Sequence, residues 1–246
     1  MKLEICAGSW TSALAAKSGG AYRVELCSGL DEGGLTPSAG LIRKVCALEG
    51  IKKHVLIRPR GGDFLYSRDE KEIILDDIKR ACDMGADGVV VGALLADGSI
   101  DIDFLHECVK TAGGVNVTFH RAFDLCAKPF EALEQICDAG CNRILTSGRA
   151  ANAEVGIPML RQLVEKAAER LIIMPGCGVS PRNAARIMRE TGACEIHASA
   201  RGSVESQMKF RLSGVEMGKA DADEYILKET CEEIVRQISM EIGILN

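Results

Sequence analysis

The sequence has no excess of basic residues and no long apolar run. Its 30 lysines and arginines stand against 35 aspartates and glutamates, which gives a formal net charge of −5 and a pI near 5.5. Proteins that bind nucleic acids or membrane surfaces generally depend on a basic face, so we expect neither kind of partner. No stretch approaches the run of about 18 apolar residues that a membrane helix needs. Residues 1–7 lack the basic start and apolar segment of a signal peptide, which predicts a cytoplasmic protein.

Aromatic residues and closely spaced cysteine pairs are also scarce. Only 4% of the residues are aromatic while 47% are hydrophobic, which is typical of a core of Ile, Leu, Val and Ala in a parallel α/β protein. The eleven cysteines contain no CxxC motif, and the closest spacing is Cys137 to Cys141. This spread predicts reduced, mostly buried thiols, and it argues against a disulfide framework and against a structural zinc site.

No linker divides the 246 residues, and β-type runs alternate with amphipathic helical stretches about eight times. Strict β/α alternation over this length predicts an α/β protein with one domain, a single TIM (β/α)8 barrel over 1–246. A long loop, either a lid over the barrel mouth or an oligomer contact, is expected over 201–222, before the last helix. The expected strands are 3–7, 23–27, 55–58, 88–91, 116–119, 143–146, 171–174 and 195–198.

A doubly wound open sheet is the alternative fold for such β/α alternation. It would place a GxGxxG turn after the first strand, where this chain has CAGSWTS. Capping residues predict helix starts that fit the barrel: Ser9 is the expected N-cap of the first helix, and Ser180 with Pro181 is expected to begin the helix after the seventh strand.

The stretch VLIRPRGGDF, at positions 55–64, places charge at the end of the third expected strand. Side chains alternate along a strand, so Arg58 and Arg60 would share a face, at the end of the barrel where barrel enzymes carry their chemistry. Glu25 and His120 end the second and fifth expected strands. One interpretation is an active site in which Glu25 and His120 exchange protons with a substrate while the arginines clamp its negative charge. The other is an internal ion-pair network, or a solvated surface in the case of the arginines.

Small glycine-containing turns follow the seventh and eighth expected strands. GCGV contains Gly176 and Gly178, and ASARGS contains Ser199 and Arg201. In many barrels these two loops bind a phosphate through backbone N–H groups, so the four residues form a candidate anion site. Alternatively, the glycines only end their strands tightly.

Cys6 and Cys27 end the first two expected strands, whose backbones would lie about 4.8 Å apart. Two thiolates at such a separation suit Cu(I), a soft metal ion. The alternative is that both are buried small apolar residues, which is the commoner situation of a free cysteine.

Seven segments resemble those of the CutC family, described as copper homeostasis proteins. They lie in order within residues 23–201: VELCSGLDEGGLTPS, IRPRGGDFLYS, GADGVVVGAL, TFHRAFD, RILTSG, IMPGCGV and EIHASAR. The resemblance implies a TIM barrel, a cytoplasmic location, homo-oligomers and a role in copper handling, with Cu(I) bound by Cys6 and Cys27. No organic cofactor is evident. The chain departs from the family pattern at Cys177, where a glycine is common.

Two functional hypotheses therefore stand side by side. The resemblance favours a cytoplasmic copper homeostasis protein that binds Cu(I) through thiolates at the barrel mouth. The residues at the strand ends favour an enzyme that acts on a small anionic, phosphorylated or sugar-like metabolite. The expected partner is a copper ion in the first case and such a metabolite in the second.

Overall fold

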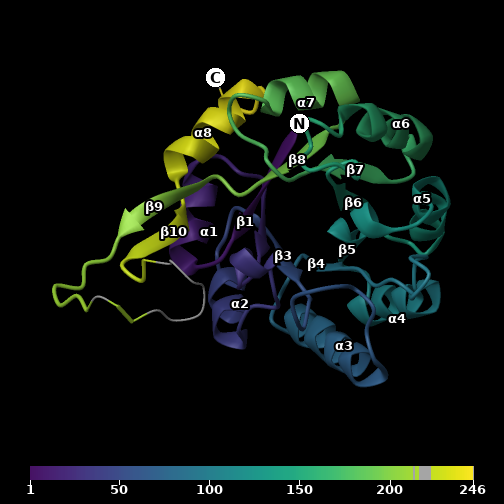
Figure 1. Cartoon of the computed structure of the whole chain (residues 1–246), viewed down its shortest axis with the longest axis horizontal. Helices are drawn as coiled ribbons and strands as arrows, with labels where there is room; N and C mark the ends of the chain where they lie inside the picture. Colours follow the sequence, from purple (N-terminus) through teal and green to yellow (C-terminus); the bar gives the residue numbers. More distant parts are fainter. Residues whose placement is uncertain (213, 216–222, 246) are drawn as a thin grey trace.

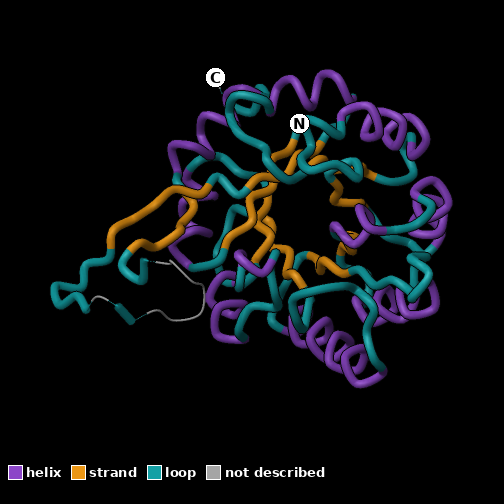
Figure 2. The backbone as a smooth tube through the Cα atoms, viewed as in Figure 1, coloured by secondary structure: helices purple, strands orange, loops and turns teal. Residues whose placement is uncertain are grey.

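Eight parallel strands form the centre of the molecule. The computed structural model describes residues 1–212, 214–215 and 223–245. Neighbouring strands pair in the order β7-β6-β5-β4-β3-β2-β1-β8, and β7 and β8, at the two ends of this order, lie beside each other. The sheet is therefore a nearly closed TIM barrel (Figure 2), as the sequence predicts. The strands are β1 Lys2–Ala7, β2 Arg23–Leu26, β3 Lys52–Leu56, β4 Gly88–Val91, β5 Asn116–Phe119, β6 Arg143–Thr146, β7 Ile172–Pro175 and β8 Glu195–Ala198.

Helices follow the strands and form an outer ring around the barrel (Figure 1). Ser9 caps α1 as expected, and Ser67 forms a capping box with Glu70 at the start of α3. Within the described part of the chain, no helix has the length and apolar character that a membrane span needs. The helices are α1 Trp10–Ser18, α2 Ala39–Cys46, α3 Arg68–Asp83, α4 Ile102–Ala112, α5 Pro129–Asp138, α6 Ile157–Ala167, α7 Ala184–Thr191 and α8 Glu232–Glu241, with the 3-10 helices η1 Leu30–Glu32 and η2 Arg121–Leu125.

The helix α7 begins later than predicted, at Ala184 rather than at Pro181. The side chain of Asn183 accepts a hydrogen bond from the backbone N–H of Ser180 and donates one to the carbonyl of Gly178. These two bonds hold the preceding residues in a turn, so the prediction from the Ser-Pro pair was wrong by one helical turn.

Side-chain alternation divides the apolar interior into two parts. Leu3 of β1 points outward and packs, fully buried, in the large core between the barrel and the helices. Cys6 lies on the opposite face of β1 and belongs to a small cluster inside the barrel, with Cys27, Leu56 and Val90. The apolar part of the barrel interior is therefore small. Toward the amino ends of the strands, the interior holds the buried polar side chains of Glu4, Arg23, Arg143 and Glu195.

A two-stranded antiparallel ribbon, β9 (Arg201–Glu205) and β10 (Ile226–Thr230), projects from the barrel (Figure 1). The structure thus differs from the predicted loop over 201–222 at its start, which is a strand. Positions 213 and 216–222 of that loop lie outside the described residues. Glu229 anchors the ribbon to α1, because its carboxylate accepts hydrogen bonds from the hydroxyls of Ser9 and Ser12.

Candidate functional site

A cavity of about 450 Å³ opens at the carboxyl end of the barrel strands. Its volume falls within the range of roughly 300–1,000 Å³ that is usual for small-molecule sites. The side chains in its wall that carry chemistry are Cys6, Glu25, Arg58, His120, Arg121, Asp124, Cys177, His197, Ser199 and Arg201.

The structure brings most of the predicted site residues together in this wall. Those that line it are Cys6, Glu25, Arg58, His120, Gly178, Ser199 and Arg201. Cys27, Arg60 and Gly176 are not part of the lining. Each of these three residues has other contacts in the structure, which explain its position.

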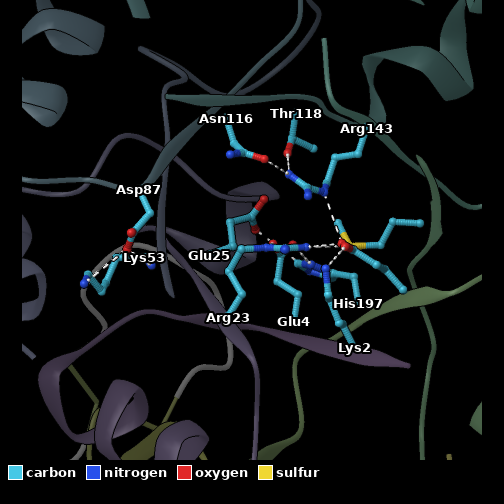
Figure 3. Close-up of polar contacts among 12 residues, drawn as sticks. Lys2, Glu4, Arg23, Glu25, Lys53, Asp87, Asn116, Thr118, Arg143 and His197 are labelled. Carbon is cyan, nitrogen blue, oxygen red and sulfur yellow. Dashed lines mark hydrogen bonds and ion pairs between the residues drawn. The ribbon is translucent and has the colours of Figure 1, made fainter. Parts of the chain in front are cut away.

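A buried ion-pair network lies inside the barrel, in contact with the cavity residues (Figure 3). Arg23 pairs with both Glu4 and Glu195, and Arg143 also pairs with Glu195, at 3.1 Å. Burial raises the pKa of Glu4, but the charge of Arg23 and the hydrogen bond with His197 outweigh burial and hold this pKa well below its ordinary value. Glu4 is therefore an ionised structural carboxylate, as the ion-pair interpretation expects.

His197 connects this network to the cavity. Its Nδ1 lies 2.7 Å from a carboxylate oxygen of Glu4, and its Nε2 lies 3.9 Å from one of Glu25 (Figure 3). Burial alone would lower the pKa of His197, but the charge of Glu25 and hydrogen bonds with Cys6 and Glu4 raise it well above its ordinary value. The carboxyl groups on either side of the ring therefore favour its protonated form. Sequence reasoning assigned no role to this residue.

Glu25 is 6% exposed and faces both the network and the cavity. Burial raises the pKa of Glu25 to about 8 against the attraction of His197, and the charges of Glu4 and Cys6 add to the rise. A carboxyl group with such a pKa can give up or take up a proton near neutral pH, which is the property of a general acid or base.

The thiols of Cys6 and Cys27 lie against each other in the small cluster inside the barrel. A hydrogen bond from Cys27 lowers the pKa of Cys6, and together with His197 it outweighs burial. The same bond and burial raise the pKa of Cys27, whose Sγ lies 3.7 Å from the carbonyl of Ala7. Two adjacent sulfur atoms suit Cu(I), so these residues fit the metal that the resemblance implies.

Glu4, Glu25 and His197 form a second group that could hold a metal ion, because one ligand atom of each lies within 4.8 Å of the others. Glu4 is already engaged with Arg23 and with the Nδ1 of His197. Carboxylate and imidazole ligands also suit Zn²⁺ or Mn²⁺ better than Cu(I). The group is therefore a poorer set of copper ligands than the two thiols.

His120 follows β5 and is 5% exposed. Its Nδ1 accepts a hydrogen bond from the backbone N–H of Ala122, at 3.1 Å. Burial lowers the pKa of His120 to about 3, and the positive charge of Arg58 adds to this effect. The ring is therefore neutral at physiological pH.

The two arginines of the IRPRGGDF stretch have different surroundings. Arg58 is buried, and its guanidinium donates to three backbone carbonyls of the adjacent loops at 2.7 to 3.1 Å. Arg60 pairs with Glu70 at 2.5 Å and with Asp63 at 3.2 Å. The strand β3 ends at Leu56, so the alternation that would place both arginines on one face does not extend to Arg60. Arg58 shapes the cavity wall, whereas Arg60 ties its loop to the start of α3.

The glycine turns after β7 and β8 both reach the mouth. Gly178, Ser199 and Arg201 line the cavity. Gly176 has a packing role, because a Cβ at this position would lie 2.5 Å from Cδ1 of Leu145 and 3.2 Å from the Cβ of His197. The absence of a side chain at Gly176 thus gives both residues room, which supports the view that this glycine ends its strand tightly.

The fold and the cavity define a class of protein: a TIM barrel whose carboxyl mouth holds a polar cavity with acidic, basic and thiol groups. The sequence profile of the CutC family matches residues 1–202. The chain belongs to the CutC family.

Relatives from bacteria and mammals match most of the chain. A Bacteroides thetaiotaomicron protein named as a CutC family protein is 53% identical over 226 residues, which cover 91% of both chains. The mouse copper homeostasis protein cutC homolog is 47% identical and the human one 46%, over 96% of this chain and 88% and 87% of theirs. The bacterial name gives the family alone, whereas the mammalian names state copper homeostasis.

Solved structures agree with the fold. A CutC structure from Streptococcus agalactiae is 33% identical, with a TM-score of 0.77 over 81% of this chain and 98% of that chain. Phosphoribosylanthranilate isomerase from Thermotoga maritima is 13% identical, with a TM-score of 0.57 over the full length of both chains, and shares the barrel fold alone.

Proposed function

We propose that the mouth cavity is the active site of an enzyme that acts on a small anionic metabolite. The observation that carries this proposal is the convergence of the carboxyl group of Glu25, the thiol of Cys6 and the imidazoles of His120 and His197 in the wall of one cavity. Enzymes that transfer protons or form covalent intermediates need such groups within reach of one substrate. Holding a metal ion between two thiols requires neither the imidazole of His120 nor a cavity of about 450 Å³.

The wall also supports the anionic character of the substrate. Arg58, Arg121 and Arg201 bring positive charge to the wall from the segments after β3, β5 and β8. Arg121 is paired with Asp124, and Arg201 lies 3.5 Å from the carboxylate of Asp31, so Arg201 is the arginine that an anion would most readily engage. None of the described residues that line it is a lysine, so we do not propose a Schiff-base mechanism. Proton transfer involving Glu25 is the chemistry that these residues support best.

A thermal-shift screen of the purified chain against small phosphorylated, carboxylated and neutral sugar-like metabolites tests this proposal. We expect anionic hits that are lost in Arg201→Ala, which removes a charge at the mouth. Arg189→Ala, on the exposed side of α7, is the matched control and should keep every hit. A screen without specific hits, or hits that Arg201→Ala retains at full affinity, would contradict the proposal.

A second candidate function is Cu(I) binding by Cys6 and Cys27. The position of both thiols in one small cluster inside the barrel supports it, as do the names of the mouse and human relatives. Anaerobic titration with Cu(I) against a competing chelator should show tight binding that is mostly lost when both cysteines are changed to serine. Cys194→Ser, at an exposed position, is the control. Equal affinity in the double variant and the parent chain would exclude this site.

We also propose that the protein works in a reducing compartment such as the cytoplasm, because all eleven cysteines are free thiols.

The ribbon of β9 and β10 leads us to propose a homo-oligomer. Among the described residues β9 and β10 pair only with each other, and they expose Val204 and Leu227 by 50% and 48%. An isolated two-stranded ribbon is marginally stable in water, so a second copy is the proposed cover. Light scattering should show an oligomer that Val204→Lys weakens, and a monomeric parent chain would contradict this.

A further inference from the structure

His120 carries a polar atom that the protein itself leaves without a partner. The residue is 5% exposed and lines the cavity, and its Nε2 has no hydrogen-bond partner among the described residues. A buried nitrogen without a partner destabilises the fold, so its retention at a cavity wall calls for a ligand that binds it.

The hydrogen bond at the other nitrogen fixes what Nε2 can do. The backbone N–H of Ala122 donates to Nδ1 of His120 at 3.1 Å. A backbone N–H is always a donor, so Nδ1 must be the unprotonated nitrogen. The neutral ring then carries its single proton on Nε2, which makes Nε2 a donor and leaves it without a lone pair for a metal ion.

Packing holds the ring in this orientation. The Nδ1–Cε1 edge lies over Gly92, where an added Cβ would come within 2.5 Å of both atoms. The ring of Phe64 lies against the imidazole, with centroids 4.9 Å apart at an interplanar angle of 49°. The guanidinium of Arg58 in turn lies over the ring of Phe64, 5.0 Å from its centroid. The donor is therefore preorganised, since its direction is set before any ligand arrives.

We propose that His120 is held as the neutral Nε2–H tautomer and donates a hydrogen bond to a carbonyl or carboxylate oxygen of the substrate. This inference deepens the proposed function and rests on it: the substrate would be a small anion with such an oxygen, and His120 would polarise that oxygen rather than transfer a proton. No bond to His120 forms or breaks, so the proton stays on Nε2 throughout.

The charge state of the ring agrees with this geometry. Burial lowers the pKa of His120 to about 3, and Arg58 repels a second positive charge. A neutral imidazole is a better match than an imidazolium for this role, because it strengthens its hydrogen bond as negative charge develops on the oxygen and needs no counter-ion.

Nitrogen NMR of the full chain labelled with ¹⁵N-histidine tests the tautomer without any ligand. The spectrum should assign the proton of His120 to Nε2, unchanged between pH 6 and pH 8. A proton on Nδ1, or an imidazolium in that range, would overturn the inference. This measurement needs no substrate, so its result does not depend on the metabolite screen. A wrong tautomer and a wrong proposed function would therefore be recognised separately.

The same sample tests the oxygen acceptor. Pyruvate, hydroxyacetone and propionate present a ketone with a carboxylate, a ketone alone and a carboxylate alone, and we expect at least one to shift the Nε2 resonance. His120→Gln keeps a donor and should retain the affinity for that probe within about threefold, whereas His120→Ala should lose on the order of tenfold. A shift with none of the three probes, or only with inorganic phosphate, would overturn the assignment, and so would equal losses in both variants.

Discussion

The imidazole of His197 lies between two carboxyl groups, 2.7 Å from Glu4 and 3.9 Å from Glu25. Arg23 keeps Glu4 ionised, whereas burial raises the pKa of Glu25 to about 8. Two acidic groups on either side of one ring therefore have pKa values pushed in opposite directions, which is the pattern by which enzymes separate structural from proton-transferring carboxyl groups. The ion-pair network inside the barrel thus contributes to the raised pKa of Glu25 at the cavity wall.

Glu4→Gln should strongly destabilise the barrel. The substitution removes the negative charge that Arg23 and His197 face, and breaking a buried ion pair from one side typically costs about 3–5 kcal/mol. Urea denaturation followed by circular dichroism measures the free energy of unfolding. Glu49→Gln, at an exposed loop position, should change it by less than about 0.5 kcal/mol. A loss below about 1 kcal/mol for Glu4→Gln would contradict the role of this carboxylate in the network.

Acid should destabilise the fold through its two buried neutral histidines. Burial lowers the pKa of His54 and His120 to about 3 in the folded chain, whereas the unfolded chain binds these protons near pH 6.5. The stability that each ring contributes is thus complete above about pH 6.5 and is lost as the pH falls toward 3. Lowering the pH from 7.5 to 5 should reduce the free energy of unfolding by about 2 kcal/mol for each of the two rings.

Urea titrations at pH 7.5 and pH 5 check this expectation. His120→Gln should reduce the difference between the two pH values by about 2 kcal/mol. His106→Gln, on the exposed side of α4, should leave the difference unchanged. If His120→Gln and the parent chain show the same pH dependence, the ring at position 120 is not a buried neutral group.

Cys6 should be alkylated at a lower pH than an ordinary thiol. The hydrogen bond from Cys27 and the neighbouring His197 lower the pKa of Cys6, so its reactive thiolate should form at a lower pH than that of an ordinary cysteine. Iodoacetamide labelling between pH 5 and pH 9, followed by peptide mass spectrometry, gives a midpoint for each cysteine. The midpoint of Cys6 should lie below the value of about 8.5 of an unperturbed thiol and should rise in His197→Gln. A midpoint at or above about 8.5 in the parent chain would be the opposite result.

Cys177→Gly should stabilise the chain. Cys177 has a φ of 79°, in the left-handed region that favours glycine. Relief of this strain outweighs the greater freedom of glycine in the unfolded chain, and we expect a gain of roughly 0.5–1 kcal/mol. Thermal unfolding of Cys177→Gly and Cys177→Ala checks this, because alanine keeps the strain. A glycine variant no more stable than the alanine variant would contradict the expectation.

The barrel could be predicted from the sequence because it depends on local patterns. Each β/α unit carries its own apolar periodicity, and the bounds of β4, β5, β6 and β8 agree with the predicted ranges. The third strand was placed too late, at 55–58 instead of Lys52–Leu56, since its polar first residues Lys52 and Lys53 hide its start. This error also led to the prediction that Arg58 and Arg60 share a face.

The role of His197 could not be predicted, because its partners are distant in the sequence. Glu4 is 193 residues away, and it is the pairing of β1 with β8 that places the two residues opposite each other. The alternation of side chains along a strand was the available signal. His197 follows Glu195 by two residues, so both side chains point into the barrel. The unpartnered Nε2 of His120 likewise depends on the backbone of η2, which the sequence pattern does not reveal.

Binding of a small anionic substrate in the mouth cavity is tested most directly by the electron density of the cavity. The crystals are grown from protein purified anaerobically and are soaked with the best hit of the metabolite screen. We expect density for that molecule between Glu25 and Arg201, with one of its oxygens within hydrogen-bonding distance of His120 Nε2. Density for a metal ion between Cys6 and Cys27, with only water in the cavity, would contradict the claim and favour the copper site.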